Sequence, residues 1–270
     1  KWGSVVEVDS VNMSGNTFDI CLVESFNSRW NGNCLICYDN GTNGVSKIAA
    51  VRYNMTITLS GSYGTSDTFK SNAVGHIGVI WSKAHNVAVV SYSNGSDSDK
   101  LTVTVGAPDD VNSPQISWGS STRVDPSGGA GLSPNGVFPT PSCYCDATNR
   151  FILAFPDSTG STGKCIVGKT SGINSTGAPT FGAFTDINGG SDTPYLNMVY
   201  DHGNDKVVFL YEDEGNSDKG TASVGTVNAS NLTIAFGSET VFNNENTEQI
   251  AGAYDTVNKS IAVAYRENGD

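Results

Sequence analysis

Short runs in which apolar and polar residues alternate recur along the chain, and no segment carries a sustained apolar stripe at helical spacing. The clearest runs open with an aromatic residue followed by glycine. They are WGSVVEV at Trp2, YGTSDTF at Tyr63, WGSSTRV at Trp118, FGAFTDI at Phe181 and FGSETVF at Phe236. Their starts lie 61, 55, 63 and 55 residues apart. This regular spacing predicts a repeat architecture, a propeller or a solenoid, with insertions in its loops.

A second set of runs keeps the same period, because five apolar strands end in an aromatic residue before a polar turn. The aromatic residues are Tyr38, Tyr92, Phe155, Tyr211 and Tyr265. Each strand follows a shorter one that ends in an acidic or polar residue, such as NMVYD or AGAYD, and a third strand follows, as in GTASVGTV. Short connections imply four antiparallel strands in meander order. Such a unit has two apolar faces, which predicts an all-β β-propeller whose blades cover one another.

We therefore expect one β-propeller domain over residues 1–270, with about five blades. The predicted blades are residues 9–69, 70–124, 125–187, 188–242, and 243–270 together with 1–8. In this scheme WGSVVEV is a fourth strand that completes the last blade. The chain is then a piece of a longer one, for which six or seven blades are the alternative.

Composition fits this architecture and narrows the function. The 31 glycines and the low charged fraction of 16% are typical of a turn-rich β protein. A net charge of −12 repels a phosphate backbone, so we expect no nucleic acid partner. No apolar run reaches the roughly 18 residues needed to cross a bilayer, so no membrane insertion is expected.

The six cysteines lie in strand-like runs, which favours free thiols that act as small buried apolar side chains. They are Cys21, Cys34, Cys37, Cys143, Cys145 and Cys165. The Cys34-Leu-Ile-Cys37 spacing is the alternative, a metal site. Because these two residues fall on opposite faces of one strand, zinc is disfavoured.

The segment from Gly215 to Phe242, with AYDTVNKSIAVAYRENGD after it, resembles a tandem repeat of structural proteins of tailed bacteriophages and marine viruses. The similarity is close over residues 192–270, recognisable over 141–187 and degenerate over 17–124. The resemblance implies a virion surface or tail protein, located on the virion or outside the cell, whose partners are other virion proteins. It implies no catalytic residues.

Five-bladed propellers include glycosidases, which need two or three carboxylates that converge at one mouth of the channel, and the ends of the first strands are where such carboxylates could lie. The candidates are Glu24, Asp146, Asp201 and Asp255, with Ser82 at the equivalent place in the second blade. The preferred interpretation is that each repeated aspartate caps the following turn. The three histidines, His76, His85 and His202, have no nucleophile partner implied by spacing.

Two kinds of loop are candidates for ligand binding. The loops YDNGTNG, YSNGSDSD and YEDEGNSD concentrate oxygen donors; solvated turns are the preferred interpretation, calcium the alternative, and no cofactor is assigned. For glycans, the candidates are Trp30 with Asn31 and Asn33, because this tryptophan lies in a polar loop outside the repeat pattern. Trp30 folded back onto its own hairpin is an equal alternative. The insertion at 128–141 is the other irregular loop.

These observations predict a non-enzymatic virion protein that presents a propeller for assembly or for attachment to a host-surface glycan. A propeller glycoside hydrolase acting at the channel mouth is the alternative.

Overall fold

The computed structural model describes residues 18–23, 33–51, 57–58, 66–109, 115–125, 140–156 and 162–268. These residues form an all-β protein of antiparallel sheets, without any α-helix, and thus with no helix that could cross a membrane. Two compact units are formed, the first by Lys1–Gly128 with Thr170–Pro179 and the second by Gly129–Lys169 with Thr180–Asp270. The predicted fold class, all-β with propeller-type blades, is confirmed.

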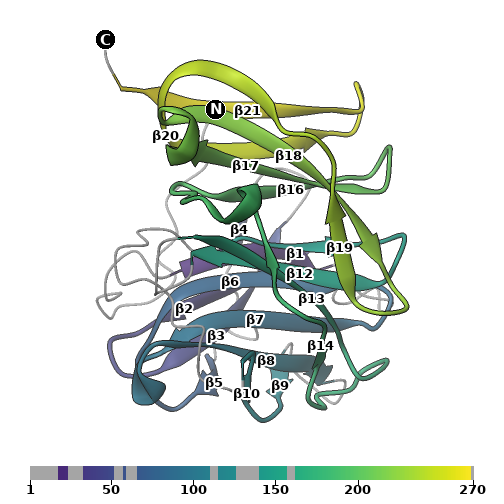
Figure 1. Cartoon of the computed structure of the whole chain (residues 1–270). Helices are drawn as coiled ribbons and strands as arrows, with labels where there is room; N and C mark the ends of the chain where they lie inside the picture. The colour runs from purple at the N-terminus through teal and green to yellow at the C-terminus, as the bar shows by residue number, and fades with distance from the viewer. Residues whose placement is uncertain are drawn as a thin grey trace. The chain divides into compact units, whose positions relative to one another are not determined.

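The first unit contains two sheets in meander order (Figure 1). One sheet consists of β1 (Phe18–Val23), β2 (Asn33–Asp39), β3 (Gly44–Val51), β4 (Ile57–Thr58) and β5 (Asp67–Lys70). The other consists of β6 (Val74–Ser82), β7 (Val87–Asn94), β8 (Lys100–Asp109), β9 (Gln115–Trp118) and β10 (Thr122–Arg123). A 3-10 turn, η1 (Gly95–Asp97), connects β7 to β8.

The second unit repeats this plan. Its first sheet consists of β11 (Ser142–Cys145), β12 (Arg150–Pro156), β13 (Gly163–Lys169), β14 (Thr180–Phe181) and β15 (Thr185–Asp186). Its second consists of β16 (Asn197–Asp201), β17 (Lys206–Asp213), β18 (Lys219–Asn228), β19 (Thr233–Phe236), β20 (Thr240–Asp255) and β21 (Ser260–Glu267). The 3-10 turns η2 (Asn188–Gly190) and η3 (Glu214–Asn216) lie in its connections.

The aromatic-glycine pairs of the sequence lie where the fourth strand of a sheet breaks into two pieces. Trp118, Phe181 and Phe236 each end the first piece and each lie opposite a glycine of the third strand. The glycine that follows each aromatic residue donates its N–H to a carbonyl of the third strand, at 2.9–3.0 Å. This carbonyl belongs to the valine that directly precedes the third-strand glycine. These three repeats are therefore structurally equivalent. The members at Trp2 and Tyr63 lie outside the described residues.

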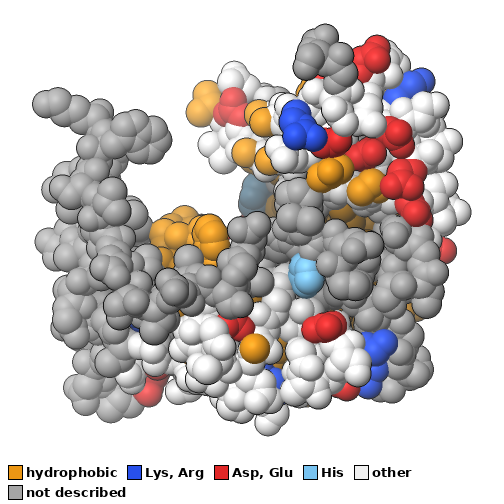
Figure 2. Space-filling view, turned by 90° about the vertical axis from the view of Figure 1, so that its left-hand side faces the viewer, with side chains coloured by type: hydrophobic (Ala, Val, Ile, Leu, Met, Phe, Trp, Pro, Cys, Tyr) orange, Lys and Arg blue, Asp and Glu red, His pale blue; other side chains and the backbone are white. Residues whose placement is uncertain are grey.

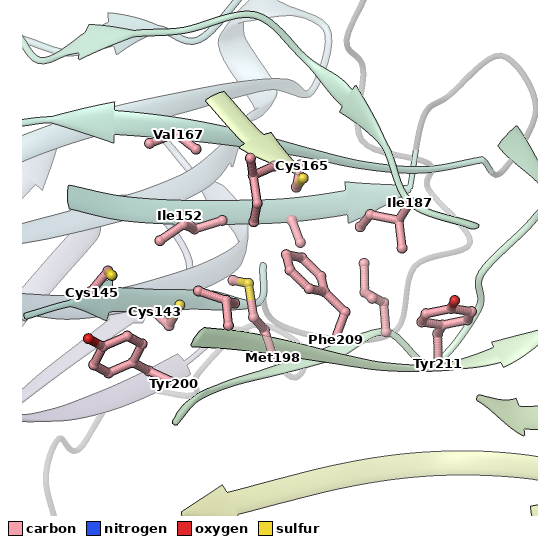
Figure 3. Close-up of a cluster of buried hydrophobic side chains, with 14 of the residues drawn as sticks. Cys143, Cys145, Ile152, Cys165, Val167, Ile187, Met198, Tyr200, Phe209 and Tyr211 are labelled. Atoms are coloured by element: carbon pink, nitrogen blue, oxygen red, sulfur yellow. The ribbon is translucent and has the colours of Figure 1, made fainter. Parts of the chain in front are cut away.

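The cores lie between the faces of adjacent sheets in each unit. In the second unit, buried side chains of β11, β12 and β13 pack against those of β16 and β17, with Cys143, Cys145 and Cys165 among them (Figure 3). In the first unit, Cys37 is part of the corresponding core. All six cysteines are free thiols. The predicted role of cysteine as a small core residue is confirmed at these four positions.

The first strands of neighbouring sheets lie side by side within each unit: β1 with β6, and β11 with β16 and then β20. β20 is unusual because its first half pairs with β18 and its second half pairs with β21. One strand thus closes one sheet and opens the next hairpin. The completion of the last blade by residues 1–8 concerns residues outside the described part. The ends of β11, β16 and β20 carry the side chains of the candidate functional site.

Candidate functional site

The candidate carboxylates of the second unit lie where its first strands end. Asp146 directly follows β11, Asp201 ends β16 and Asp255 ends β20. Because these strands are neighbours that run in the same sense within their repeats, their ends lie at one edge of the unit. In the first unit, Ser82 ends β6 and is fully buried, and Glu24 lies outside the described residues.

Asp201 and Asp255 cap their own turns. The Asp201 carboxylate accepts hydrogen bonds from the N–H of Gly203 at 2.9 Å and from the Nδ2 of Asn204 at 2.8 Å. The Asp255 carboxylate accepts equivalent bonds from the N–H of Val257 at 2.8 Å and the Nδ2 of Asn258 at 2.6 Å. The asparagine side chains lower the pKa of both carboxyls. The turn-capping interpretation is confirmed for both, and neither group is suited to act as a general acid near neutral pH.

Asp146 has a different partner. Its Oδ2 lies 3.1 Å from the Nδ1 of His202, the first residue of the turn after β16. The His202 ring lies edge-on to Tyr200, with ring centres 4.6 Å apart, and 5.4 Å from the ring centre of Tyr254. Three successive first strands therefore contribute to one group of side chains. We call Asp146, Tyr200, His202 and Tyr254 the tyrosine–histidine cluster.

Tyr200 anchors this cluster on the core. Its ring is 5% exposed and lies at one end of the buried side chains between the two sheets (Figure 3). Its hydroxyl donates to Oδ1 of Asp205 at 2.9 Å and accepts from the N–H of Ala147 at 3.3 Å. Burial raises the pKa of Tyr200 well above its usual value, so the hydroxyl stays neutral. His202 thus rests on a fixed aromatic base.

The outer members of the cluster are open to solvent. The side chains of His202 and Asp146 are 51% and 43% exposed. Tyr254 is partly exposed, and its hydroxyl lies over Gly203, where a side-chain carbon would come within 2.8 Å of it. The arrangement combines an accessible imidazole, a carboxylate and an aromatic ring with its hydroxyl. Such a combination can stack on a flat apolar surface and hydrogen-bond at its rim.

The predicted glycan-binding residues are not brought together by the described structure. Trp30 and Asn31 lie outside the described residues. Asn33 is the first residue of β2, and its side chain is buried. The other two histidines lie against hydroxyl groups: His76 Nδ1 is 3.3 Å from Ser93 Oγ, and His85 Nδ1 contacts Thr170 Oγ1.

The oxygen-rich loops mainly hold their own turns. Asn40 Oδ1 accepts from the N–H of Asn43 at 2.9 Å, and Asn94 Oδ1 accepts from the hydroxyl of Ser96 at 2.7 Å. Among the described residues, no group of three or more His, Cys, Asp or Glu side chains is arranged to hold a metal ion. Near its end, β17 carries a buried carboxyl, Glu212, whose pKa burial raises to about 7.

Comparison with known proteins finds no matching family model and no matching curated protein. Among solved structures, the chain is similar to the exo-β-1,3-galactanase of Phanerochaete chrysosporium. With β-1,3-galactotriose present in that enzyme, the identity is 9%, the TM-score is 0.40, and 84% of this chain and 48% of the enzyme are covered. For the structure of that enzyme with galactose, the identity is 10%, the TM-score is 0.41, and 83% of this chain and 54% of the enzyme are covered. The chain spans about half the length of these structures.

The non-enzymatic interpretation of the sequence is wrong. The finding that contradicts it is that both solved structures described above are of an enzyme, an exo-β-1,3-galactanase.

Sequence reasoning identified Asp146 and His202 separately but missed the cluster. It also missed Tyr200 and Tyr254 as site residues. The signal was present, because in both NMVYD and AGAYD a tyrosine directly precedes the terminal aspartate. Once the first strands are placed side by side, two such tyrosines flank the residue that follows Asp201.

Proposed function

We propose that the tyrosine–histidine cluster binds a carbohydrate. The observation that carries this proposal is the exposed His202 ring, paired with Asp146 and flanked by Tyr200 and Tyr254. A pyranose has apolar faces that pack on aromatic rings and a rim of hydroxyls that exchange hydrogen bonds. The cluster offers an aromatic surface beside donors and acceptors, the combination that oriented small-molecule sites use.

The charges of the site favour a neutral or cationic sugar over an acidic one. Asp146, Asp201, Asp205 and Asp255 all lie at or beside the ends of β11, β16 and β20, within a chain of net charge −12. On the face shown in Figure 2, acidic side chains are also more widespread than basic ones. An acidic glycan would be repelled here.

Hydrolysis of the bound glycan is the second candidate function. The observation that favours it is the Asp146–His202 pair, because a carboxylate that holds one imidazole nitrogen leaves the other to accept or donate a proton. The assignment to a virion surface, which came from the repeat resemblance, remains a proposal independent of either function.

The test is binding of the purified chain to an array of neutral, amino and acidic glycans, followed by calorimetric titration of the best ligands. Two variants, Tyr254→Ala and His202→Ala, remove the exposed rings. Tyr265→Ala is the matched control, because Tyr265 is 41% exposed on β21 and lies outside the cluster. Loss of one ring contact of about 1–2 kcal/mol weakens binding roughly 5- to 30-fold.

We expect both cluster variants to lose affinity by that factor while Tyr265→Ala binds as the parent chain does. Equal binding by all three variants would refute the site. Reducing-sugar release from the same glycans, lost in His202→Ala, would identify the second candidate. Binding without release would leave carbohydrate recognition as the function.

A further inference from the structure

The carboxylate of Glu212, near the end of β17, is buried without compensation. The residue is only 7% exposed, and its Oε2 has no hydrogen-bond partner in the described part of the chain. A buried carboxylate is unfavourable unless hydrogen bonds or a positive charge replace the water that it has lost. Because buried polar groups in folded proteins are nearly always partnered, this oxygen requires an explanation.

The first sheet shows how an acidic residue at this position is satisfied. Asp39 directly follows the buried aromatic residue of β2, as Glu212 does in β17, and it is also buried. Its two carboxylate oxygens accept the N–H groups of Gly41 and Val74, each at 2.5 Å. Val74 is the first residue of β6, so this carboxylate joins its own sheet to the next one.

In β20 the equivalent N–H points elsewhere. His76 of β6 and Gln249 of β20 lie in bulges with φ values of 50° and 52°. Aligning the two bulges makes Thr247 the counterpart of the first residue of β6. The N–H of Thr247 donates to the main-chain carbonyl of Asp218 at 3.0 Å. Glu212 therefore lacks the donor that the first sheet provides.

β20 borders the face of the sheet on which the Glu212 side chain lies. Glu212 is paired with Gly220 of β18, so both residues face the same side of the sheet. A side-chain carbon at Gly220 would lie 2.9 Å from the Oγ1 of Thr247. The residue before Thr247 is Asn246, which is paired with the residue before Gly220. Asn246 is thus near the end of β17.

Two further oxygen-bearing side chains accompany Glu212. Asn246 Nδ2 donates to Asp218 Oδ2 at 3.4 Å, which leaves Asn246 Oδ1 buried and without a partner among the described residues. Burial, followed by the charges of Asp218 and Glu214, raises the pKa of Glu212 to about 7. Asp218 therefore lies close enough to Glu212 for their charges to repel each other. Two orphaned acceptors and a second carboxylate meet at this place.

The chemistry of these atoms identifies the missing partner as a hard cation. Acceptor oxygens without donors are satisfied by a positive ion, and calcium takes both carboxylate and amide oxygens in irregular arrangements. Magnesium demands a near-ideal octahedron and retains its water, and zinc prefers nitrogen and sulfur ligands. Two carboxylates and one amide form a set without a third ionisable ligand. Such a low ligand charge is typical of weak calcium sites, with a Kd of about 10⁻⁴–10⁻³ M.

We propose that Glu212, Asp218 and Asn246 bind a calcium ion at the end of β17. The ion neutralises the Glu212 carboxylate and provides a partner for Asn246 Oδ1. It connects β17 to β20, as the Asp39 carboxylate connects the sheets of the first unit. β17 begins beyond the turn that contains His202 and ends at this site, so calcium binding is separate from the tyrosine–histidine cluster.

The test is calorimetric titration of the full chain with calcium chloride at pH 7.5, after treatment with a chelator. We expect one ion per chain with a Kd in the range above. Because calcium would bind the folded chain, about 10 mM of it should raise the melting temperature by about 3–10 °C. Magnesium chloride at the same concentration should produce a smaller rise.

Two variants, Glu212→Gln and Asp218→Asn, each remove one charged ligand and keep the size of the side chain. We expect each to weaken calcium binding at least tenfold. Glu239→Gln is the matched control, because Glu239 is exposed between β19 and β20 and its loss removes the same charge. Its affinity should stay within about twofold of the parent value.

The melting temperatures without calcium distinguish a lost site from a lost fold. Glu212→Gln removes an uncompensated buried charge, so it should melt no lower than the parent chain. Asp218→Asn gives a second measurement of the same site, because asparagine tolerates the positive φ of 60° at this position.

Four results would overturn the proposal. The first is a parent chain that binds no calcium up to about 10 mM. The second is unchanged affinity in both ligand variants, which would place the ion elsewhere. The third is equal weakening by Glu239→Gln, which would show diffuse attraction to an acidic surface. The fourth is tighter binding of magnesium than of calcium.

Discussion

Replacing two glycines of the same sheet with alanine should have opposite effects on stability. A side-chain carbon at Gly225 would lie 2.9 Å from Ile234 Cγ1 and 3.3 Å from Phe209 Cε2, inside a packed core. Overpacking of this kind costs about 1–3 kcal/mol. At Gly237 the nearest atom would be 3.8 Å away, so alanine fits. Its smaller freedom in the unfolded chain then stabilises the fold by about 0.4–1 kcal/mol.

The measurement is thermal unfolding of Gly225→Ala and Gly237→Ala beside the parent chain, followed by tryptophan fluorescence and by calorimetry. A change of 1 kcal/mol corresponds to about 2–4 °C in a protein of this size. We expect Gly225→Ala to melt about 3–10 °C lower and Gly237→Ala to melt at or slightly above the parent temperature. If both variants melted equally low, the glycines would serve backbone conformation and not space, and the structural account of the aromatic-glycine repeat would fail.

Three further predictions concern charge and thiols. Burial raises the pKa of Glu212 from 4.5 to about 7, and the charges of Asp218 and Glu214 add to this rise. The folded chain therefore holds the proton of Glu212 more tightly than the unfolded chain does, so the free energy of unfolding falls as the pH rises from about 4.5 past 7. At 1.36 kcal/mol per pKa unit this loss of stability is about 3 kcal/mol, and solvent screening reduces it to about 1–2 kcal/mol. The measurement is denaturant titration at pH 5 and pH 8, in which Glu212→Gln should remove this pH-dependent loss. Asp201→Ala should cost about 1 kcal/mol at pH 7, and this cost should shrink as the pH falls toward and below the lowered pKa of Asp201, where its carboxylate becomes protonated; a cost that does not change with pH would contradict the turn-capping role. A thiol reagent should label at most two cysteines before denaturation, because four are buried: Cys37, Cys143, Cys145 and Cys165.

The fold could be predicted from the repeat period because each repeated residue meets the same packing requirement at the same place in its sheet. The aromatic before glycine needs a glycine opposite it, and the aromatic at the end of the second strand needs a core position, as at Tyr211. Such requirements recur once per repeat and therefore appear as a period in the sequence.

The candidate functional site could not be predicted from the repeat period in this way. Asp146 and His202 are 56 residues apart in the sequence and meet only because β11 and β16 lie side by side. A single sequence shows that both strands end in aspartate, but it does not show that one aspartate turns to its own backbone and the other to a histidine. That choice depends on the asparagine three positions after each aspartate. Asn204 and Asn258 donate hydrogen bonds to Asp201 and Asp255. Asn149, three positions after Asp146, instead accepts a hydrogen bond from the Tyr144 hydroxyl.

The double membership of β20 has a mechanical consequence. Because one unbroken backbone of 16 residues pairs with β18 in its first half and with β21 in its second, fraying of the terminal hairpin pulls directly on the ladder that closes the preceding sheet. The terminal hairpin is thereby joined to the preceding sheet by one continuous paired strand as well as by its side chains.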